Sequence, residues 1–246
     1  MKYERYERQT KLSFWGKKEQ KRLEKAKVLV AGIGGLGCYV SLALVSAGVG
    51  YLRLVDYDVV ELSNLNRQIL FRESDLGKSK VKVAVNALNL YNSEVEIKGI
   101  EEKITEKNVL ELTQSMDVII DCLDNFESRY LLNKACIDQE IPLVHGALYG
   151  FEGRVAFFIP KKTPCLRCIY PHEPRVSKEP SPALSTTCGV IASIQANEAI
   201  KYLTKIGKVL INKLLIYDGE TLGFKFIDIK KRKKCKECGK RLFSQS

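Results

Sequence analysis

The sequence of 246 residues contains no uninterrupted run of eighteen apolar residues, and its first thirty residues are rich in charge. A membrane-spanning helix needs about 20 mostly apolar residues. A secretory signal peptide needs an apolar core of roughly 7–15 residues after a short basic start. The chain offers neither segment. These absences predict a cytoplasmic protein with no membrane partner.

Histidine is scarce, since His145 and His172 are the two in the chain. Histidine is the side chain most often used as a general acid or base, so catalysis of that kind has few candidates. We expect His145 and His172 to be structural or exposed. The composition also excludes a disordered tail protein, because 45 % of the residues are hydrophobic and 28 % are charged, as in ordinary globular proteins.

The net charge of +11 is concentrated at the two ends of the chain. Residues 1–27 carry a net charge of +6 and residues 230–241 carry +7, which leaves the remainder near −2. A protein that coats nucleic acid is expected to be basic throughout. The distribution argues against such a coat and is compatible with local basic patches.

Apolar, β-branched runs alternate with segments of helical periodicity, which is typical of an α/β sheet. The predicted strands are 27–31, 51–55, 95–100, 117–121, 142–145, 153–159, 213–217 and 223–229. The predicted helices are 36–47, 78–91, 126–139 and 189–204, with a further helix capped by Thr105. We expect a Rossmann-like, doubly wound, mostly parallel sheet with late antiparallel strands.

Proline is rare outside one segment, because six of the seven prolines fall between residues 160 and 188. A loop of that length needs a function or an external staple, so we predict a crossover loop there. No internal repeat is visible. We therefore expect one domain over residues 1–246, with parts described in chain order: a helical arm at 1–26, a nucleotide-binding core at 27–159, the crossover loop at 160–188 and a C-terminal part at 189–246.

A glycine-rich turn follows the first predicted strand. Gly32, Gly34 and Gly37 form the pattern G-x-G-x-x-G, and Gly35 lies inside it. Backbone N–H groups at such a turn, together with the helix N-terminus, bind phosphate groups. Asp56 ends the second strand, where a carboxylate accepts hydrogen bonds from ribose hydroxyls. We predict a nucleotide site rather than a surface turn.

Two cations and an acid identify the nucleotide more closely. Arg67 lies in the loop after the second strand, Lys80 opens the next helix and Asp124 follows the strand at 117–121. An ATP attacked at its α-phosphate needs cations to neutralise developing charge, whereas a dinucleotide is held largely by backbone groups. Carboxylate oxygens are the ligands that Mg²⁺ prefers. The set predicts an ATP site with a magnesium ion at Asp124.

Four of the eight cysteines form two C-x-x-C pairs, Cys165 with Cys168 and Cys235 with Cys238. Cytoplasmic cysteines are expected to be reduced, and each pair can supply two thiolates to one tetrahedral zinc. Such a zinc would pin the crossover loop and the basic C-terminal segment to the body. We predict a structural zinc with no open coordination position. Redox-active thiols and unrelated cysteines are the alternatives.

Among the other four cysteines, three are expected to be structural and one is a candidate reactive thiol. Cys38, Cys122 and Cys136 are expected to be small buried hydrophobic residues. Cys188 is predicted just before the helix at 189–204, where the positive end of the helix would lower the pKa of the thiol. Two interpretations stay open for Cys188: a nucleophile that takes the activated acyl group or relays sulfur, or a buried residue that closes the loop.

These motifs resemble those of the ThiF/MoeB/HesA family, the prokaryotic relatives of ubiquitin-activating enzymes. The matching segments are 5–9, 32–38, 56–58, 63–68, 77–80, 121–125 and 189–201. They span nearly the whole chain. One departure concerns the crossover loop, where many members have a cysteine around residues 178–180 and this chain has none.

The resemblance implies ATP-dependent adenylation of the C-terminal glycine of a small ubiquitin-like sulfur-carrier protein ending in Gly-Gly, with release of pyrophosphate. It implies a homodimer in which Arg8 reaches the nucleotide of the other subunit. It implies that Asp56 binds the ribose and that Asp124 binds Mg²⁺. The resemblance also implies that the phosphates are contacted by Asn64, Arg67, Gln68 and Lys80. The family often carries the two C-x-x-C pairs as well.

Several alternatives remain at this point. The activated carrier could serve molybdopterin synthesis, thiamine synthesis, tRNA thiolation or protein modification, with a sulfurtransferase or a tRNA as a further partner. A tRNA-nucleoside dehydratase of the same superfamily is the alternative enzyme, although the paired C-x-x-C motifs argue against it. An NAD-dependent oxidoreductase leaves Arg67, Lys80 and Asp124 without a role. A non-enzymatic adaptor is disfavoured by the complete set of nucleotide-site residues.

Overall fold

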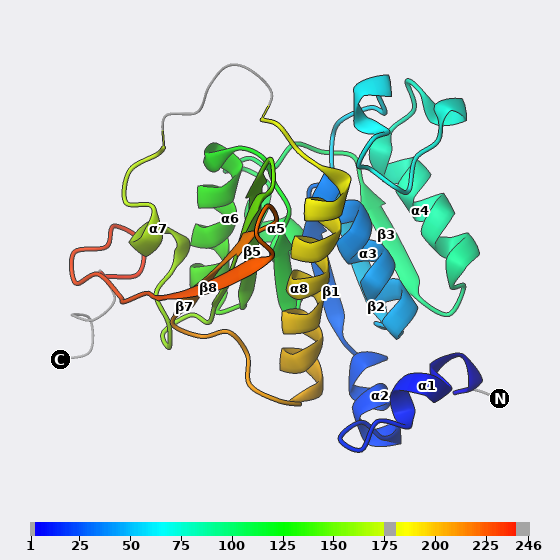
Figure 1. Cartoon of the computed structure of the whole chain (residues 1–246), viewed down its shortest axis with the longest axis horizontal. Helices are drawn as coiled ribbons and strands as arrows, with labels where there is room; N and C mark the ends of the chain where they lie inside the picture. Colours follow the sequence, from blue (N-terminus) through cyan, green and yellow to red (C-terminus); the bar gives the residue numbers. More distant parts are fainter. Residues whose placement is uncertain (1–2, 175–180, 240–246) are drawn as a thin grey trace.

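The computed structural model describes residues 3–174 and 181–239, and Figure 1 shows their arrangement. Eight strands form one sheet in the order β3-β2-β1-β4-β5-β6-β7-β8. The strands are β1 (Lys27–Ala31), β2 (Tyr51–Val55), β3 (Glu96–Ile100), β4 (Val118–Asp121), β5 (Leu143–Tyr149), β6 (Glu152–Phe158), β7 (Lys213–Asp218) and β8 (Gly223–Asp228). β1 to β5 pair in parallel, and β6 to β8 are antiparallel. The predicted fold class is confirmed.

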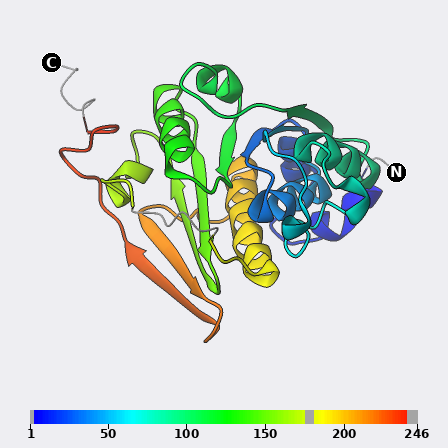
Figure 2. The ribbon, with the colours of Figure 1, turned by 90° about the horizontal axis from the view of Figure 1, so that it is seen from above.

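Helices cover both faces of the parallel part of the sheet (Figure 2). The α-helices are α1 (Glu7–Thr10), α2 (Lys17–Leu23), α3 (Gly35–Ala47), α4 (Lys80–Tyr91), α5 (Val109–Thr113), α6 (Phe126–Asp138), α7 (Leu166–Ile169) and α8 (Ser185–Thr204). Three short 3₁₀ helices are η1 (Glu4–Tyr6), η2 (Leu62–Asn64) and η3 (Glu73–Asp75).

The central strands are buried on both faces, as their unbroken apolar sequences require. In β1, Val28 and Val30 belong to the core that includes residues of α3, α4 and α8. Leu29 and Ala31 face the opposite core, which includes residues of α5 and α6. The β1 side chains therefore alternate between two hydrophobic layers, and this burial stabilises the sheet from both sides.

The sheet changes direction of growth at β1. β2 and β3 extend it on one side, whereas β4 and β5 extend it on the other. In open α/β sheets, ligands bind beside the carboxyl ends of the strands at such a switch point. The ends of β1, β2 and β4 carry Gly32, Asp56 and Asp124, so the fold brings three separate sequence motifs to one edge.

The segment expected to be a featureless crossover loop contains more order than predicted. α7 lies within it, and α8 begins at Ser185 rather than at Gly189. The four added residues include Thr186 and Thr187, which are weak helix formers, so the helical periodicity becomes clear only later in the sequence. β5 also extends to Tyr149, and α5 begins at Val109, later than a cap at Thr105 predicts.

Candidate functional site

The glycine-rich turn is a tight connection from β1 to α3. Gly32 has a positive φ of 88°, and a Cβ there would lie 2.8 Å from the carbonyl oxygen of Cys122. A Cβ on Gly37 would lie 1.9 Å from the carbonyl oxygen of Gly32. Both positions need glycine because the backbone leaves no space for a side chain. The turn presents the N-terminus of α3 at the edge of the sheet, where free N–H groups suit an anion.

Asp56 ties the end of β2 to this turn. Its Oδ2 accepts a hydrogen bond from the backbone N–H of Ile33 at 2.6 Å, and its Oδ1 accepts one from Asp58 at 2.8 Å. Burial raises the pKa of Asp56, and the two backbone hydrogen bonds oppose that shift. Each carboxylate oxygen has a further lone pair, so Asp56 can also accept from a ribose hydroxyl.

Lys80 is held at the same edge by an ion pair that the sequence analysis did not include. Its Nζ lies 2.9 Å from Oδ2 of Asp58, and the Lys80 side chain is only 8 % exposed. The backbone N–H of Lys80 donates to the carbonyl of Asp58 at 3.0 Å. Asp58 therefore fixes both the start of α4 and the ammonium group of Lys80. The signal for Asp58 was present in the sequence, as the second acid of Asp56-Tyr57-Asp58.

The loop that begins at η2 brings Arg67 and Gln68 to the glycines. A Cβ on Gly35 would lie 3.5 Å from Cγ and Cδ of Arg67, and a Cβ on Gly34 would lie 3.7 Å from Nε2 of Gln68. Nη1 of Arg67 donates to the Ser63 carbonyl at 2.9 Å, which orients the guanidinium. Asn64 is buried in the same loop, and its Oδ1 accepts from the Glu61 N–H at 3.1 Å.

Asp124 is exposed in the turn between β4 and α6. The Asn125 amide donates to Oδ1 of Asp124 at 3.2 Å, and Oδ1 of Asn125 caps α6 by accepting from the Ser128 N–H at 2.9 Å. Burial raises the pKa of Tyr57, and the nearby carboxylates of Asp58, Asp124 and Asp56 raise it further. The end of β4 therefore adds an accessible hard oxygen ligand to the same edge.

A buried group of side chains, Asp121, Arg129 and His145, supports the turn between β4 and α6. This group was not predicted from the sequence. Oδ2 of Asp121 lies 2.7 Å from Nδ1 of His145, and Oδ1 accepts from the Leu123 N–H at 3.0 Å. Arg129 donates to the carbonyls of Leu123 and Gly146. Burial lowers the pKa of His145, although Asp121 opposes the shift. As expected, His145 is structural in its surroundings and His172 is exposed.

Cys188 lies against the nucleotide turn, but its environment differs from the prediction. A Cβ on Gly35 would lie 2.7 Å from Sγ of Cys188. Cys188 is in the first turn of α8 and is 1 % exposed. Burial raises the pKa of its thiol to about 11, and the charge of Arg67 opposes the shift only in part. The predicted lowering of the pKa by the helix end is wrong, because desolvation outweighs it. Cys38, Cys122 and Cys136 are buried, as predicted.

Arg8 lies at the other end of the molecule. It is exposed on α1, and its neighbour Gln9 donates from Nε2 to the carbonyl of Ala47 at 2.8 Å, at the end of α3. α3 begins at the nucleotide turn and is about 20 Å long at 1.5 Å per residue. Arg8 is therefore far from the nucleotide turn of its own chain (Figure 1).

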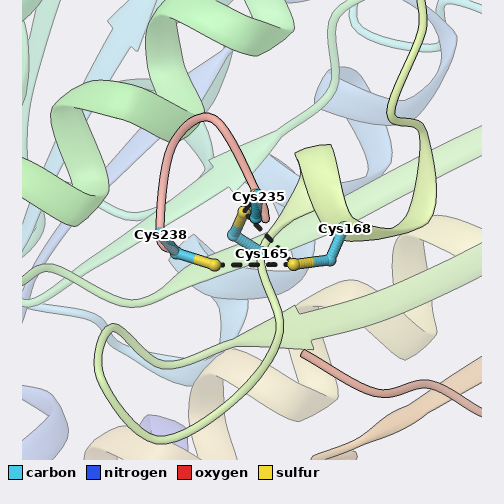
Figure 3. A group of neighbouring side chains, drawn as sticks. All are labelled: Cys165, Cys168, Cys235 and Cys238. Atoms are coloured by element: carbon cyan, nitrogen blue, oxygen red, sulfur yellow. Dashed lines mark hydrogen bonds between the residues drawn. The ribbon is translucent and has the colours of Figure 1, made fainter. Parts of the chain in front are cut away.

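The four cysteines of the two C-x-x-C pairs meet in one cluster (Figure 3). Their ligand atoms all lie within 4.8 Å of one another. Sγ of Cys165 is 3.6 Å from that of Cys235, and Sγ of Cys168 is 3.4 Å from that of Cys238. Four zinc–sulfur bonds of about 2.3 Å in a tetrahedron place the sulfurs about 3.8 Å apart. The donor set and its spacing fit a closed tetrahedral zinc site.

Together, the doubly wound sheet, its phosphate-binding turn and the surrounding charges define a Rossmann-like nucleotide-binding protein. Residues 6–239 match the model of the ThiF family, and the chain belongs to that family. The family membership predicted from the motifs is therefore confirmed. Within the described residues, no helix combines the length and apolar character that crossing a bilayer requires.

Two relatives are similar over nearly their whole length. The sulfur carrier protein adenylyltransferase of Thermus thermophilus is 39 % identical over 245 residues, which cover 96 % of this chain and 90 % of the relative. The SAMP-activating enzyme E1 of Haloferax volcanii is 38 % identical over 240 residues, covering 96 % and 88 %. The first name describes an adenylyltransferase of a sulfur carrier protein, and the second describes an activating enzyme.

One further relative is longer than this chain, and another is known from a crystal structure. The adenylyltransferase and sulfurtransferase MOCS3 of Culex quinquefasciatus is 39 % identical over 245 residues, 95 % of this chain, yet the chain spans only 55 % of that protein. The crystal structure of E. coli MccB with ATP superposes with a TM-score of 0.86 at 26 % identity, covering 96 % of this chain and 74 % of that one.

Proposed function

We propose that this protein uses Mg·ATP to adenylate the C-terminal glycine carboxylate of a small ubiquitin-like sulfur-carrier protein and releases pyrophosphate. The observation that carries the proposal is the convergence of Lys80, Arg67 and Asp124 on the glycine-rich turn. The relatives named above support an adenylyltransferase. The convergence of cations also favours this function over a dinucleotide-dependent oxidoreductase.

The chemistry needs few groups from the protein. A carboxylate is already a nucleophile, so attack on the α-phosphate requires positioning and charge neutralisation rather than a general base. Asp56 would hold the ribose, and the N–H groups at Gly34 and Gly35 would face the phosphates. Lys80 would exchange its contact with Asp58 for a phosphate oxygen. Asn64, Arg67 and Gln68 would complete the phosphate contacts, and Asp124 would bind Mg²⁺, which neutralises phosphate charge.

The proposal includes a homodimer. Within the described part of the chain, Arg8 forms no side-chain hydrogen bond or ion pair, and it lies far from its own nucleotide turn. A second copy of the chain could place Arg8 beside the nucleotide of the first, as the family resemblance implies. Sedimentation would test the dimer, and mixing Arg8→Ala with Lys80→Ala subunits would test the sharing. Recovery of about a quarter to a half of the activity is expected if each site needs one group from each chain.

A structural zinc at the four cysteines is also part of the proposal. Four thiolates leave no open coordination position, so the metal would support the fold rather than the reaction. The cytoplasm, which keeps thiols reduced and supplies ATP, would be the compartment of such an enzyme.

The partner that receives the activated carrier follows less directly. The name of MOCS3 couples an adenylyltransferase with a sulfurtransferase, so a separate sulfurtransferase is one candidate. The four lysines and one arginine at 230–234, of which Lys231 is half-buried and the others are exposed, could attract a tRNA or an acidic face of the carrier. Replacing these five cations with glutamine tests both partners. Carrier affinity that is unchanged at low salt would argue against carrier steering, and unchanged tRNA binding would argue against tRNA.

Exchange of pyrophosphate with ATP tests the central reaction. Candidate small proteins ending in Gly-Gly should start the exchange, and the same proteins with the last glycine removed should not. Exchange that never occurs, or that occurs without any carrier, would contradict the proposal. A tRNA-nucleoside dehydratase would instead show ATP consumption that depends on tRNA.

A further inference from the structure

One face of α6 connects the cysteine cluster to Asp124. Phe126, Tyr130, Asn133 and Ile137 are spaced by four, three and four residues, which places them in a single stripe along the helix. We call these four residues the α6 stripe. Phe126 is the first residue of α6 and follows the Asp124-Asn125 turn directly. Ile137 lies one residue before the end of the helix.

The far end of the α6 stripe is part of the cysteine cluster. Ile137 packs in one hydrophobic group with Cys165, Cys168, Cys235 and Cys238. Oδ1 of Asn133 accepts a hydrogen bond from the N–H of Leu166 at 3.0 Å. Leu166 is the first residue of α7, and Cys165 is its N-cap. The stripe therefore contacts the first C-x-x-C pair through both an apolar side chain and a hydrogen bond.

Tyr130 in the middle of the stripe contacts the segments that flank the cysteines. Its hydroxyl donates to the carbonyl of Tyr170 at 3.0 Å. The Arg167 guanidinium lies over its ring at 3.2 Å from the centroid. Arg167 in turn pairs with Glu237 at 3.9 Å, and Glu237 lies between Cys235 and Cys238. Tyr130 is thus linked directly to the first C-x-x-C pair through Arg167, and through Arg167 and Glu237 to the second.

The near end of the stripe fixes the turn that carries Asp124. The Phe126 ring packs against Tyr170 at 5.3 Å in an edge-to-face arrangement and against Tyr130 at 5.6 Å. Asn125, the residue before Phe126, caps α6 and hydrogen-bonds the Asp124 carboxylate. A shift of Phe126 would move this cap, and with it the oxygen ligands of Asp124.

We propose that the α6 stripe positions Asp124 according to the state of the cysteine cluster, so that metal binding at the cysteines strengthens Mg²⁺ binding at the nucleotide site. Tyr130 is the central positioning residue. Loss of the metal would free the 230–239 segment, and with it Glu237, the partner of Arg167. Arg167 in turn contacts Tyr130, and Tyr130 packs against Phe126. The inference rests on the proposed function, because it concerns the magnesium site that this function assigns to Asp124.

The test measures Mg²⁺ rather than catalysis. Calorimetry gives the half-saturating Mg²⁺ concentration for Mg·ATP binding by the zinc-loaded protein and by the full chain stripped with a chelator. Stripping should raise that concentration about tenfold, which matches typical coupling energies between sites. The affinity for ATP without Mg²⁺ should change less than about twofold, because the contacts of the stripe lead to the turn that carries Asp124 rather than to Lys80 or Arg67.

Variants then locate the coupling. Tyr130→Ala should raise the half-saturating Mg²⁺ concentration in the zinc-loaded protein, and stripping should add less than about twofold to it. Tyr130→Phe keeps the ring and loses only the hydroxyl contacts, so an intermediate value is expected. Tyr202→Leu is the matched control, because Tyr202 pairs edge-to-face with Phe157 against the other core. It should keep the full tenfold response.

Two results would overturn the inference. One is a half-saturating Mg²⁺ concentration that is the same with and without zinc. The other is a full zinc response in Tyr130→Ala or, if that variant does not fold, an undiminished response in Tyr130→Phe. Failure of the proposed function has a different signature, because a protein that binds no ATP under any of these conditions would overturn both.

Discussion

The nucleotide site and the region of the cysteine cluster, which we call the nucleotide end and the cysteine end of the molecule, are organised by different means. At the switch point between β1 and β4, functional residues follow strand ends directly, and backbone N–H groups that donate to Asp56 and Asp121 fix the turns. At the other end, β8 is largely exposed, with Phe224 52 % and Phe226 54 % accessible. Cysteines seventy residues apart hold that end together. The nucleotide end is specified by local sequence, whereas the cysteine end depends on long-range links.

The largest expected effect is at the nucleotide end. Lys80→Ala should reduce carrier-dependent pyrophosphate exchange about 100- to 1,000-fold, because it removes a buried cation from charge that develops in the transition state. Lys82→Ala is the matched control on the same helix, since the Lys82 side chain is 73 % exposed and pairs with Glu101. The control should stay within about twofold of the native protein.

Unfolding measurements check that Lys80→Ala keeps the fold. Lys80 pairs with Asp58, so its removal leaves a half-exposed carboxylate rather than a buried unpaired charge. A folded Lys80→Ala protein with native exchange would show that the cation has no role in the reaction. It would also remove the main observation behind the proposed function.

The second-largest expected effect is a loss of stability at the cysteine end. Cys238→Ser should lower the free energy of unfolding by ~2 kcal/mol or more, because loss of a metal ligand is one of the few changes with large effects. It should also make the 230–239 segment sensitive to proteases. Cys136→Ala is the control: it removes a buried thiol outside the cluster and should leave the destabilising effect of a chelator unchanged. A Cys238→Ser protein as stable as the native one would argue against a structural metal.

The sequence predicted where the strands around the candidate nucleotide site end, because the relevant signals are short. Gly32, Asp56 and Asp124 each stand beside a clear apolar strand, and a parallel sheet brings such ends together. Asp58 was missed although it lies two residues from Asp56, since an acid near a strand end is also common on surfaces. The motif gave no indication that its carboxylate pairs with Lys80, twenty-two residues further on.

The buried contacts beneath the site and the start of α8 could not be predicted, because they depend on residues far apart in the sequence. His145 and Asp121 meet across neighbouring strands, and Arg129 reaches two carbonyls from α6. α8 begins at Ser185, four residues before the predicted start at Gly189. In the structure Gly189 is inside the helix, where a Cβ would lie 3.4 Å from Cε1 of Tyr39. Its small size serves packing between α8 and α3 rather than helix termination.

A smaller effect concerns pH. His145 is buried and its pKa is lowered, whereas a histidine in the unfolded chain titrates near pH 6.5. The unfolded state therefore takes up its proton first, so the contribution of neutral His145 to stability is complete above pH ~6.5 and declines as the pH falls below that value. Denaturant unfolding between pH 8 and pH 5 should show this decline. His145→Asn should flatten it, and an equal decline in both proteins would show that other groups cause it.

The smallest expected effect separates the two interpretations of Cys188. Its thiol has a pKa of about 11 and is 1 % exposed, so thiolate is scarce at neutral pH and alkylation by iodoacetamide at pH 8 should be slow in the folded protein. Cys188→Ser changes one atom and should leave pyrophosphate exchange within about twofold. Sulfur transfer from the carrier should likewise persist in Cys188→Ser, because nothing at this site lowers the thiol pKa enough to offset burial. Rapid alkylation, or loss of transfer with exchange intact, would instead show that the crossover segment opens and exposes Cys188 as a nucleophile after adenylation.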